Sequence, residues 1–150
     1  MKIAVGGDHK GFPLKAKLLE EIQALGHEVT DFGCYNEEPV DFPDVAKQIC
    51  GEILAGRAER GIMFCGSGVG AAIACNKIAG IRASVCHDIF TAHQCVEHDN
   101  VQVMALGAQI IGYTAAFELI KLFLQAEFFE DEEFRRRVAK LDTMDAQSSK

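Results

Sequence analysis

The chain has 150 residues, of which 49% are hydrophobic and 25% are charged, so it is expected to form one globular domain. The net charge is −7 and the only basic run is Arg135–Arg137, which argues against binding to a nucleic-acid backbone. The apolar segments are shorter than the roughly 20 residues that span a bilayer, and Met1–Gly7 resembles a first strand rather than a signal peptide.

Six cysteines are present, but none of them form a CxxC pair. Because nothing marks the chain as secreted, we expect most of these thiols to be buried and to act as small hydrophobic side chains, without a disulfide framework. This cysteine usage predicts a reducing, cytoplasmic compartment.

Strand-like and helical segments alternate along the chain. The strand-like segments are short apolar runs, and the helical segments repeat apolar residues every three or four positions. In chain order we predict a strand over 2–5, a helix over about 14–25, a strand over 28–32, a helix from Pro43 to before Gly56, a strand over 61–65, a helix to about 78, a strand over 81–86, a helix over 89–97, a strand over 101–106, a helix over 113–128 and a charged helix over about 131–141.

Repeated β–α units of this length predict right-handed crossovers and a parallel sheet that helices cover on both faces. In such folds the functional site lies outside the carboxyl ends of the strands. The segments expected at this edge are Gly7–His9, Cys65–Gly70, Cys86–Asp88 and the turn at Gly107.

The loop after the third strand, Cys65–Gly70, allows more than one interpretation. Gly66, Gly68 and Ala71 match the dinucleotide-binding pattern G-x-G-x-x-G/A between a strand and a helix. In a full dinucleotide-binding domain, however, this pattern usually follows the first strand of the sheet, and here it follows the third.

Metal binding is a second interpretation, because cysteines and histidines are frequent between residues 86 and 98. None of them has the paired ligand spacing of a structural zinc site. Ordinary roles at a helix start or on the surface explain His87 and His93. The residues concerned are Cys86, His87, His93, Cys95 and His98.

A third interpretation makes Cys65 reactive. The glycine-rich turn opens a helix whose first N–H groups are unpaired and face the loop. These groups and the helix dipole are expected to lower the pKa of a thiol and to hold an oxyanion that develops on a substrate. The simpler alternative is a buried cysteine at the end of a strand.

Four segments occur in a fixed order, Val5–Phe12, Asp41–Pro43, Cys65–Gly70 and Asn76–Ala83, and His98 and Gly107 follow them. With this ordered set, the sequence closely resembles type B ribose-5-phosphate isomerases and the related galactose-6-phosphate isomerases, over about residues 2–140. The resemblance implies aldose–ketose isomerisation of a small sugar phosphate through a cis-enediolate, without a metal or organic cofactor.

The resemblance also implies a three-layer α/β/α sandwich around a five-stranded parallel sheet, of Rossmann-like type. A single sugar isomerase domain is expected over residues 1–142, followed by a flexible tail over 143–150. Family members form homodimers, often paired into tetramers, and share their sites between chains. The helix over about 131–141 is therefore expected to pack on the partner chain.

The resemblance assigns roles to the residues that match. Cys65 resembles the catalytic base, although some members carry a glutamate at the position of Ala71 instead. Asp8 resembles the group that holds substrate hydroxyls, and His98 the acid–base that opens the sugar ring. Gly66, Ser67, Gly68 and Gly70 resemble an anion hole, in which the Ser67 hydroxyl aids proton transfer. His9 and Arg137 resemble phosphate contacts. Phe42 lies at a position often held by tyrosine.

Three positions depart from the family pattern. Asp99 follows His98 in place of the usual asparagine, Gln109 replaces an arginine after the fifth strand, and Glu133 replaces the first arginine of an Arg-x-x-x-Arg pair that ends at Arg137. Two arginines one helical turn apart can hold one phosphate together, and each charge-assisted contact is worth about 1.5–3 kcal/mol.

These departures leave three hypotheses about the ligand. A neighbouring lysine or a shifted register completes a phosphate site, or the substrate is unphosphorylated or differently anchored, or the chain has lost activity, as in paired isomerase subunits of which one is degenerate. A non-catalytic sugar- or dinucleotide-binding module is the alternative from another class of function. Asp99 and Gln109 are counted among the substrate-binding residues.

Overall fold

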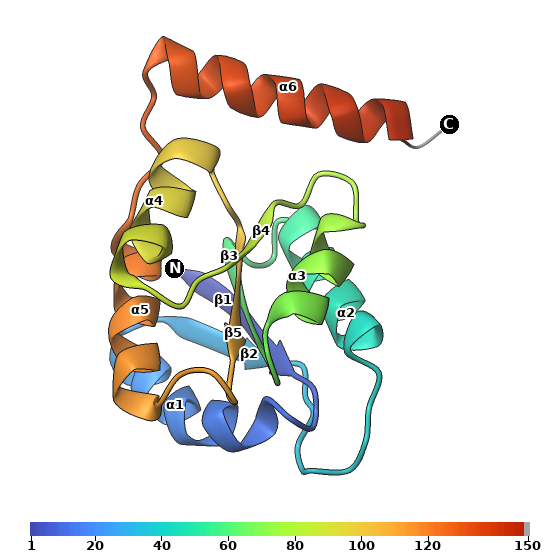
Figure 1. Cartoon of the computed structure of the whole chain (residues 1–150), viewed down its shortest axis with the longest axis vertical. Helices are drawn as coiled ribbons and strands as arrows, with labels where there is room; N and C mark the ends of the chain where they lie inside the picture. The colour runs from blue at the N-terminus through green and yellow to red at the C-terminus, as the bar shows by residue number, and fades with distance from the viewer. Residues whose placement is uncertain (149–150) are drawn as a thin grey trace.

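The computed structural model of the protein describes residues 1–148, and a parallel sheet of five strands runs through the centre of this part of the chain (Figure 1). The strands lie in the order β2-β1-β3-β5-β4. Their bounds are β1 Lys2–Gly7, β2 Glu28–Asp31, β3 Arg60–Cys65, β4 Ala83–Val85 and β5 Val103–Gly107. The register pairs Gly7 with Phe64 and Cys65 with Gly107, so the carboxyl ends of the three central strands meet at one edge.

Five helices cover the two faces of the sheet in residues 1–148, and a sixth lies across its end (Figure 1). On one face lie α1 (Phe12–Ala24), α4 (Ile89–Asp99) and α5 (Tyr113–Gln125). On the other face lie α2 (Phe42–Leu54) and α3 (Val69–Asn76). The sixth helix, α6 (Glu132–Ser148), lies across the end of the sheet opposite the loop that joins β1 to α1.

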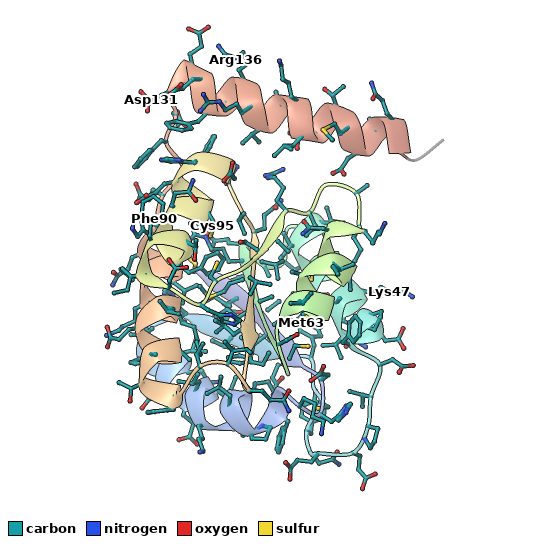
Figure 2. The ribbon with its side chains drawn as sticks, in the orientation of Figure 1. Lys47, Met63, Phe90, Cys95, Asp131 and Arg136 are labelled. Atoms are coloured by element: carbon teal, nitrogen blue, oxygen red, sulfur yellow. The ribbon has the colours of Figure 1, made fainter. Side chains whose placement is uncertain are left out.

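The alternation of side chains along the strands divides the core into two halves. Ile62 and Phe64 of β3 pack toward α1, α4 and α5, whereas Met63 and Cys65 pack toward α2 and α3. Figure 2 shows Met63 on the α3 side of the sheet and Cys95 of α4 on the other side. Both faces of the sheet are buried, as expected for a parallel sheet between two helical layers.

The structure confirms the five-stranded parallel sheet and the three-layer α/β/α sandwich, and its elements differ from the predicted ones mainly at their ends. The strand predicted over 81–86 is shorter, Ala83–Val85, and the helix predicted over 113–128 ends at Gln125. All six cysteines are buried and free, which confirms the expected buried thiols. Among residues 1–148, no helix is long and apolar enough to cross a membrane.

The largest difference concerns the C-terminal helix. The sequence predicts a helix over about 131–141 and a flexible tail over 143–150. The predicted end of the helix is wrong, because α6 continues to Ser148, and residues 149–150 lie outside the described residues. The reason is tertiary: Asp142 and Asp145 bind the body of the chain and hold the last turns of the helix. Val138 of α6 is buried, while Arg136 lies on the side away from the sheet (Figure 2).

Candidate active site

Cys65 and Asp8 lie side by side at the carboxyl edge of the sheet, because β3 ends at one and β1 ends just before the other. The Cys65 Sγ donates a hydrogen bond to Asp8 Oδ2 at 3.1 Å. The other carboxylate oxygen accepts hydrogen bonds from the backbone N–H groups of Lys10 and Gly11, both at 2.9 Å. With only 5% of its surface exposed, Asp8 is held rigidly with one oxygen against the thiol.

The pKa of the Cys65 thiol is raised above its ordinary value, first by burial and then by its hydrogen bond to Asp8, with a further contribution from the Asp8 charge. The backbone N–H groups of Gly68 and Ser67 act in the opposite direction but do not outweigh these effects. The prediction that the pKa of the Cys65 thiol is lowered is therefore wrong for the single chain. A carboxylate in contact and a buried position both disfavour a second negative charge.

The glycines between β3 and α3 allow three segments to approach one another closely. Gly68 is the N-cap of α3 and has a φ of 81°, in the left-handed region that favours glycine. A Cβ at Gly70 would come within 2.9 Å of the Phe42 ring, so this ring covers the first turn of α3. The Ser67 Oγ accepts a hydrogen bond from the Val69 N–H at 3.2 Å.

The turn after β5 closes over this glycine loop. The Ala108 N–H donates to the Cys65 carbonyl at 2.8 Å, and the Gln109 N–H donates to the Gly66 carbonyl at 3.0 Å. A Cβ at Gly66 would lie 2.9 Å from Gln109 Oε1, so the Gln109 side chain packs directly on the loop. The predicted anion-hole residues and Gln109 are therefore neighbours.

His87 lies at the carboxyl edge of the sheet and binds the turn at Gly107, a contact that was not predicted from the sequence. Its Nε2 accepts a hydrogen bond from the Gly107 N–H at 2.8 Å, and burial lowers the pKa of its imidazole, which favours the neutral ring that this acceptor role requires. The strand pattern correctly predicted that His87 lies at the carboxyl edge of the sheet. We expected it, however, to be an ordinary residue at a helix start or on the surface. The available signal was the position of His87 directly after the strand predicted over 81–86.

A cavity of about 400 Å³ lies beside the start of α1 and the turn after β5. His9 lines it, and its Nδ1 accepts a hydrogen bond from the Val40 N–H at 3.2 Å, so the proton of the neutral ring is on Nε2. Two lysines give the cavity a positive lining in a chain whose net charge is −7. The lining residues are His9, Lys10, Pro13, Leu14, Lys17, Glu37, Ala108 and Gln109.

The remaining predicted site residues lie at the opposite end of the molecule. Helix α4 starts at the carboxyl edge of β4 and leads back to the start of β5, so His98 and Asp99 in its last turn lie at the amino edge of the sheet. Arg137 is on α6, which crosses the same end (Figure 1). Within one chain, the structure therefore brings Asp8, Cys65 and the glycine loop together but does not bring His98 to them.

At this second end, His98 is held by aromatic and amide contacts. Its Nδ1 lies 2.9 Å from Gln94 Nε2, and its ring stacks on the Phe134 ring with a centroid distance of 4.3 Å. Arg137 Nη2 forms an ion pair with Glu133 Oε2 at 3.2 Å, and both side chains are more than half exposed. Glu133, at the position where the resemblance leads us to expect an arginine, thus pairs with Arg137.

The residues considered for metal binding have other partners. The Sγ atoms of Cys86 and Cys95 are 3.7 Å apart in the core, and His93 Nδ1 lies 2.7 Å from Glu97 Oε2. No group of three or more His, Cys, Asp or Glu side chains that could hold a metal ion occurs within residues 1–148.

Residues 3–141 match the family model described as Ribose/Galactose Isomerase. The chain belongs to this family. It is 37% identical over 145 residues to "Ribose-5-P isomerase B" of Listeria innocua, covering 97% of this chain and 95% of that protein. It is 41% identical over 130 residues to "D-erythrulose-4-phosphate isomerase" of Pectobacterium atrosepticum, covering 85% of each chain.

The solved structure of Clostridium thermocellum ribose-5-phosphate isomerase B superimposes with a TM-score of 0.95 at 36% identity, covering 99% of each chain. Family membership and this superposition confirm the expected fold and identify the protein as a sugar-phosphate isomerase. The finer questions are which sugar it converts and which residues carry the reaction.

Proposed function

We propose that the protein interconverts an aldose phosphate and its ketose through a cis-enediolate, with ribose 5-phosphate as the first candidate substrate and Cys65 as the base. The observation that carries this proposal is the contact between the Cys65 thiol and Asp8 beside the glycine loop that opens α3. The names of the relatives from Listeria innocua and Clostridium thermocellum support a pentose phosphate as substrate.

In the proposed reaction, the Cys65 thiolate removes the proton from C2 of the open-chain aldose and the same proton, or one from solvent, is delivered to C1. Asp8 Oδ2 is the nearest acceptor for the thiol proton, which lies on Sγ in the resting state because the thiol pKa is raised. The N–H groups at the start of α3 would stabilise the negative oxygen of the enediolate.

We propose that the second half of the site comes from a partner subunit in a homodimer. One chain separates His98 and Arg137 from Cys65, and α3 carries two apolar side chains next to the glycine loop, Val69 and Ile73, that are 54% and 56% exposed. Burial of such a surface against a second copy is favourable, and in that arrangement His98 of the partner subunit would open the sugar ring.

The cavity with Lys10 and Lys17 favours a phosphorylated substrate over a neutral sugar, despite Gln109 and Glu133. Two ammonium groups and the His9 ring can hold an anion without the two family arginines. A four-carbon substrate is the second candidate, since one relative at 41% identity is named D-erythrulose-4-phosphate isomerase.

The test is an isomerisation assay with ribose 5-phosphate, erythrose 4-phosphate, allose 6-phosphate and the free sugars, with EDTA present. We expect turnover of at least one sugar phosphate. The C65A variant should lose about 100-fold or more in kcat, because a positioned base contributes about that much, while its fold is retained. Failure of the unmodified protein to convert any sugar would overturn the enzyme proposal in favour of a sugar-binding module, and tight NAD binding would favour a dinucleotide-binding one.

The control for C65A is C75A. The Cys75 Sγ is buried 3.9 Å from Met63 Sδ, away from Asp8, so its removal should lower the free energy of unfolding by about 1 kcal/mol and leave kcat unchanged. Near-normal turnover by C65A would show that Cys65 is not the base.

A further inference from the structure

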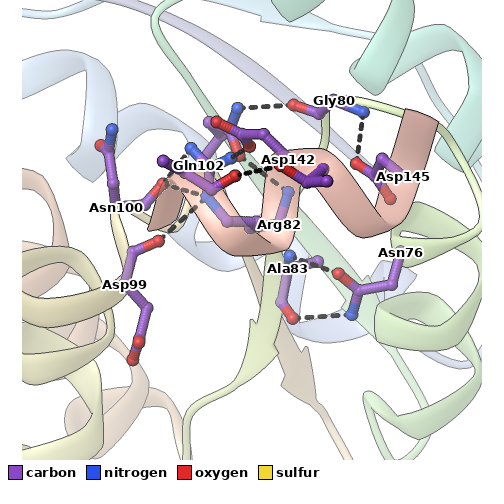
Figure 3. A network of polar contacts seen from close by, with 11 residues as sticks. Asn76, Gly80, Arg82, Ala83, Asp99, Asn100, Gln102, Asp142 and Asp145 are labelled. Carbon is purple, nitrogen blue, oxygen red and sulfur yellow. Dashed lines mark hydrogen bonds and ion pairs between the residues drawn. The ribbon is translucent and has the colours of Figure 1, made fainter. Parts of the chain in front are cut away.

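Arg82 lies just before β4 and connects three parts of the molecule that are distant in sequence (Figure 3). Its Nε donates hydrogen bonds to the carbonyls of Asp99 at 2.9 Å and Asn100 at 3.2 Å, and its Nη2 donates to the Asn100 carbonyl at 3.0 Å. Its Nη1 forms an ion pair with Asp142 Oδ1 of α6 at 2.8 Å. Only 15% of the side chain is exposed, so the guanidinium is largely enclosed by these partners.

The first of these connections fixes the end of α4. The last carbonyls of a helix have no partner within the helix, and a cation at this end is favourable. Arg82 satisfies two of these carbonyls where the chain turns at Asn100, which has a φ of 49° in the left-handed region. His98 precedes these two residues directly, so the position of the guanidinium sets the direction in which the last turn carries the imidazole.

The second connection fixes α6 against the same imidazole. Asp142 binds Arg82, and Asp145 Oδ2 accepts a hydrogen bond from the Gly80 N–H at 2.8 Å, two residues before Arg82 (Figure 3). Helix α6 also carries Phe134, whose ring stacks on His98. Arg82 therefore reaches His98 by two routes, through the backbone of α4 and through α6.

The backbone of Arg82 is itself held in place. Its N–H donates to Gln102 Oε1 at 2.8 Å, and Gln102 Nε2 donates to the Gly80 carbonyl at 2.9 Å. One side chain thus ties the segment before β4 to the segment before β5. A guanidinium on this rigid support has little freedom to follow a displaced α4 or α6.

We infer that Arg82 is a positioning residue for His98 and that its contacts are needed for ring opening rather than for the proton transfer at C1 and C2. This inference rests on the proposed function, in which His98 is the ring-opening acid–base. In ring opening, the anomeric hydroxyl loses its proton, the bond between C1 and the ring oxygen breaks, and the ring oxygen gains a proton. An imidazole must be placed accurately to move those protons.

A salt bridge with a merely structural role would affect both stages of the reaction, and two substrates of the same carbon skeleton separate these stages. Ribose 5-phosphate is mainly a five-membered ring in solution and must be opened. Ribulose 5-phosphate cannot close such a ring, because its C5 oxygen carries the phosphate. Exchange of its C1 hydrogen with solvent deuterium therefore reports enediolate formation without ring opening.

The experiment compares R82K with the unmodified protein, with H98N, and with R57K as a matched control. Arg57 forms an exposed ion pair with Glu52 at the end of α2, and the hydrogen bonds of its guanidinium go to Glu52 rather than to the carbonyls that Arg82 binds. Two rates are measured for each variant: isomerisation of ribose 5-phosphate, and deuterium exchange at C1 of ribulose 5-phosphate. Thermal unfolding is measured alongside, and D142N replaces R82K if R82K does not fold.

We expect R82K and H98N to lower kcat/KM for ribose 5-phosphate by about 10- to 100-fold, while the exchange rate changes by less than about threefold. R57K should change neither rate. D142N should show the same selective loss as R82K to a smaller degree, because it breaks only the route through α6.

Each failure has a separate meaning. No isomerisation by the unmodified protein would overturn the proposed function, and equal rates in H98N and the unmodified protein would overturn the role of His98. If H98N shows the selective loss but R82K leaves both rates unchanged, or lowers both equally, the inference about Arg82 is wrong. An unfolded R82K together with a D142N that shows no selective loss would also overturn it.

Discussion

Asp8 accepts a hydrogen bond from the thiol of Cys65 at 3.1 Å, and this contact holds the proton on the sulfur. Burial, the hydrogen bond and the carboxylate charge all raise the pKa of Cys65, so the thiolate that the proposed reaction needs is scarce at neutral pH. A thiol in this position combines a nearby proton acceptor with a high resistance to spontaneous ionisation. A thiol that stays protonated is expected to react slowly with alkylating agents, because the thiolate is the nucleophile.

The first prediction concerns the pH dependence of alkylation. The pKa of Cys65 is raised, so the rate of its reaction with iodoacetamide should keep rising with pH beyond the range of an ordinary thiol. The D8N variant removes the charge and, with its one oxygen bound to the Lys10 and Gly11 N–H groups, turns an amide NH2 toward the thiol, which should lower the pKa of Cys65 and move the whole profile to lower pH. Mass spectrometry of the Cys65 peptide measures the rate, and a D8N profile at the same or higher pH would contradict the assignment.

Much of this site follows from the sequence, and the missing parts have physical reasons. The β–α alternation placed Asp8, Cys65 and Gly107 at one edge, because carboxyl ends of parallel strands must meet. The raised pKa of Cys65 could not be predicted from the helix start alone, because it depends on burial and on a carboxylate 57 positions earlier in the chain. Local charge arguments favour the thiolate, and the tertiary neighbours reverse them.

The placement of His98 shows a different limit. A helix of 11 residues rises about 16 Å, so the end of α4 must lie far from the edge where the helix begins. The helix length therefore predicts that His98 lies far from Cys65 within one chain, and the proposed homodimer would bring the two residues into one site. The extension of α6 to Ser148, in contrast, depends on the contacts of Asp142 with Arg82 and of Asp145 with the Gly80 N–H, which no local pattern predicts.

The second prediction tests the close approach of the β5 turn to the glycine loop. A Cβ at Gly107 would lie 2.7 Å from the backbone carbon and oxygen of Ser67, so G107A must displace one of the two segments. We expect kcat/KM for the sugar phosphate to fall by about 100-fold, because the N–H groups at the start of α3 move relative to Cys65. Steady-state kinetics and crystallography of the variant would measure both effects.

The control for G107A is G51A. Gly51 lies within α2, where an added Cβ would meet no atom within 4 Å. This change should raise the free energy of unfolding by about 0.5–1 kcal/mol, since alanine favours a helix interior, and it should leave kinetics unchanged. Full activity in G107A would show that the close contact with Ser67 has no part in the reaction.

The third prediction concerns the lysines of the cavity beside His9. If Lys10 and Lys17 hold the phosphate of the substrate, K10A and K17A should each raise KM for ribose 5-phosphate by about tenfold, the loss of one contact of about 1.5 kcal/mol. Activity on free ribose, where detectable, should not change. Lys121 on α5 provides the control, because it lies outside this cavity and forms an ion pair with Glu118 at 2.7 Å, so K121A should alter neither constant. An unchanged KM in K10A and K17A would exclude the cavity as the phosphate site.

The last prediction addresses the two positions where family arginines are absent. Gln109 packs on the glycine loop, and Glu133 forms an ion pair with Arg137 at 3.2 Å that partly neutralises the remaining arginine. The combined variant Q109R/E133R restores two guanidinium groups and removes this pairing. If each restored contact contributes about 1.5–3 kcal/mol, kcat/KM for ribose 5-phosphate should rise by on the order of a hundredfold.

The matched control for this gain is Q109R/E132R. It changes the net charge by the same amount but places the second arginine one residue away on α6, about 100° around the helix from position 133. A gain that depends on phosphate geometry should appear only in Q109R/E133R and should shrink with added salt or inorganic phosphate, because these ions screen or occupy the site. Equal gains in the two variants would indicate a general effect of charge on substrate approach. No gain in Q109R/E133R would mean that guanidinium groups at positions 109 and 133 add nothing to the phosphate binding that the lysines and His9 already provide.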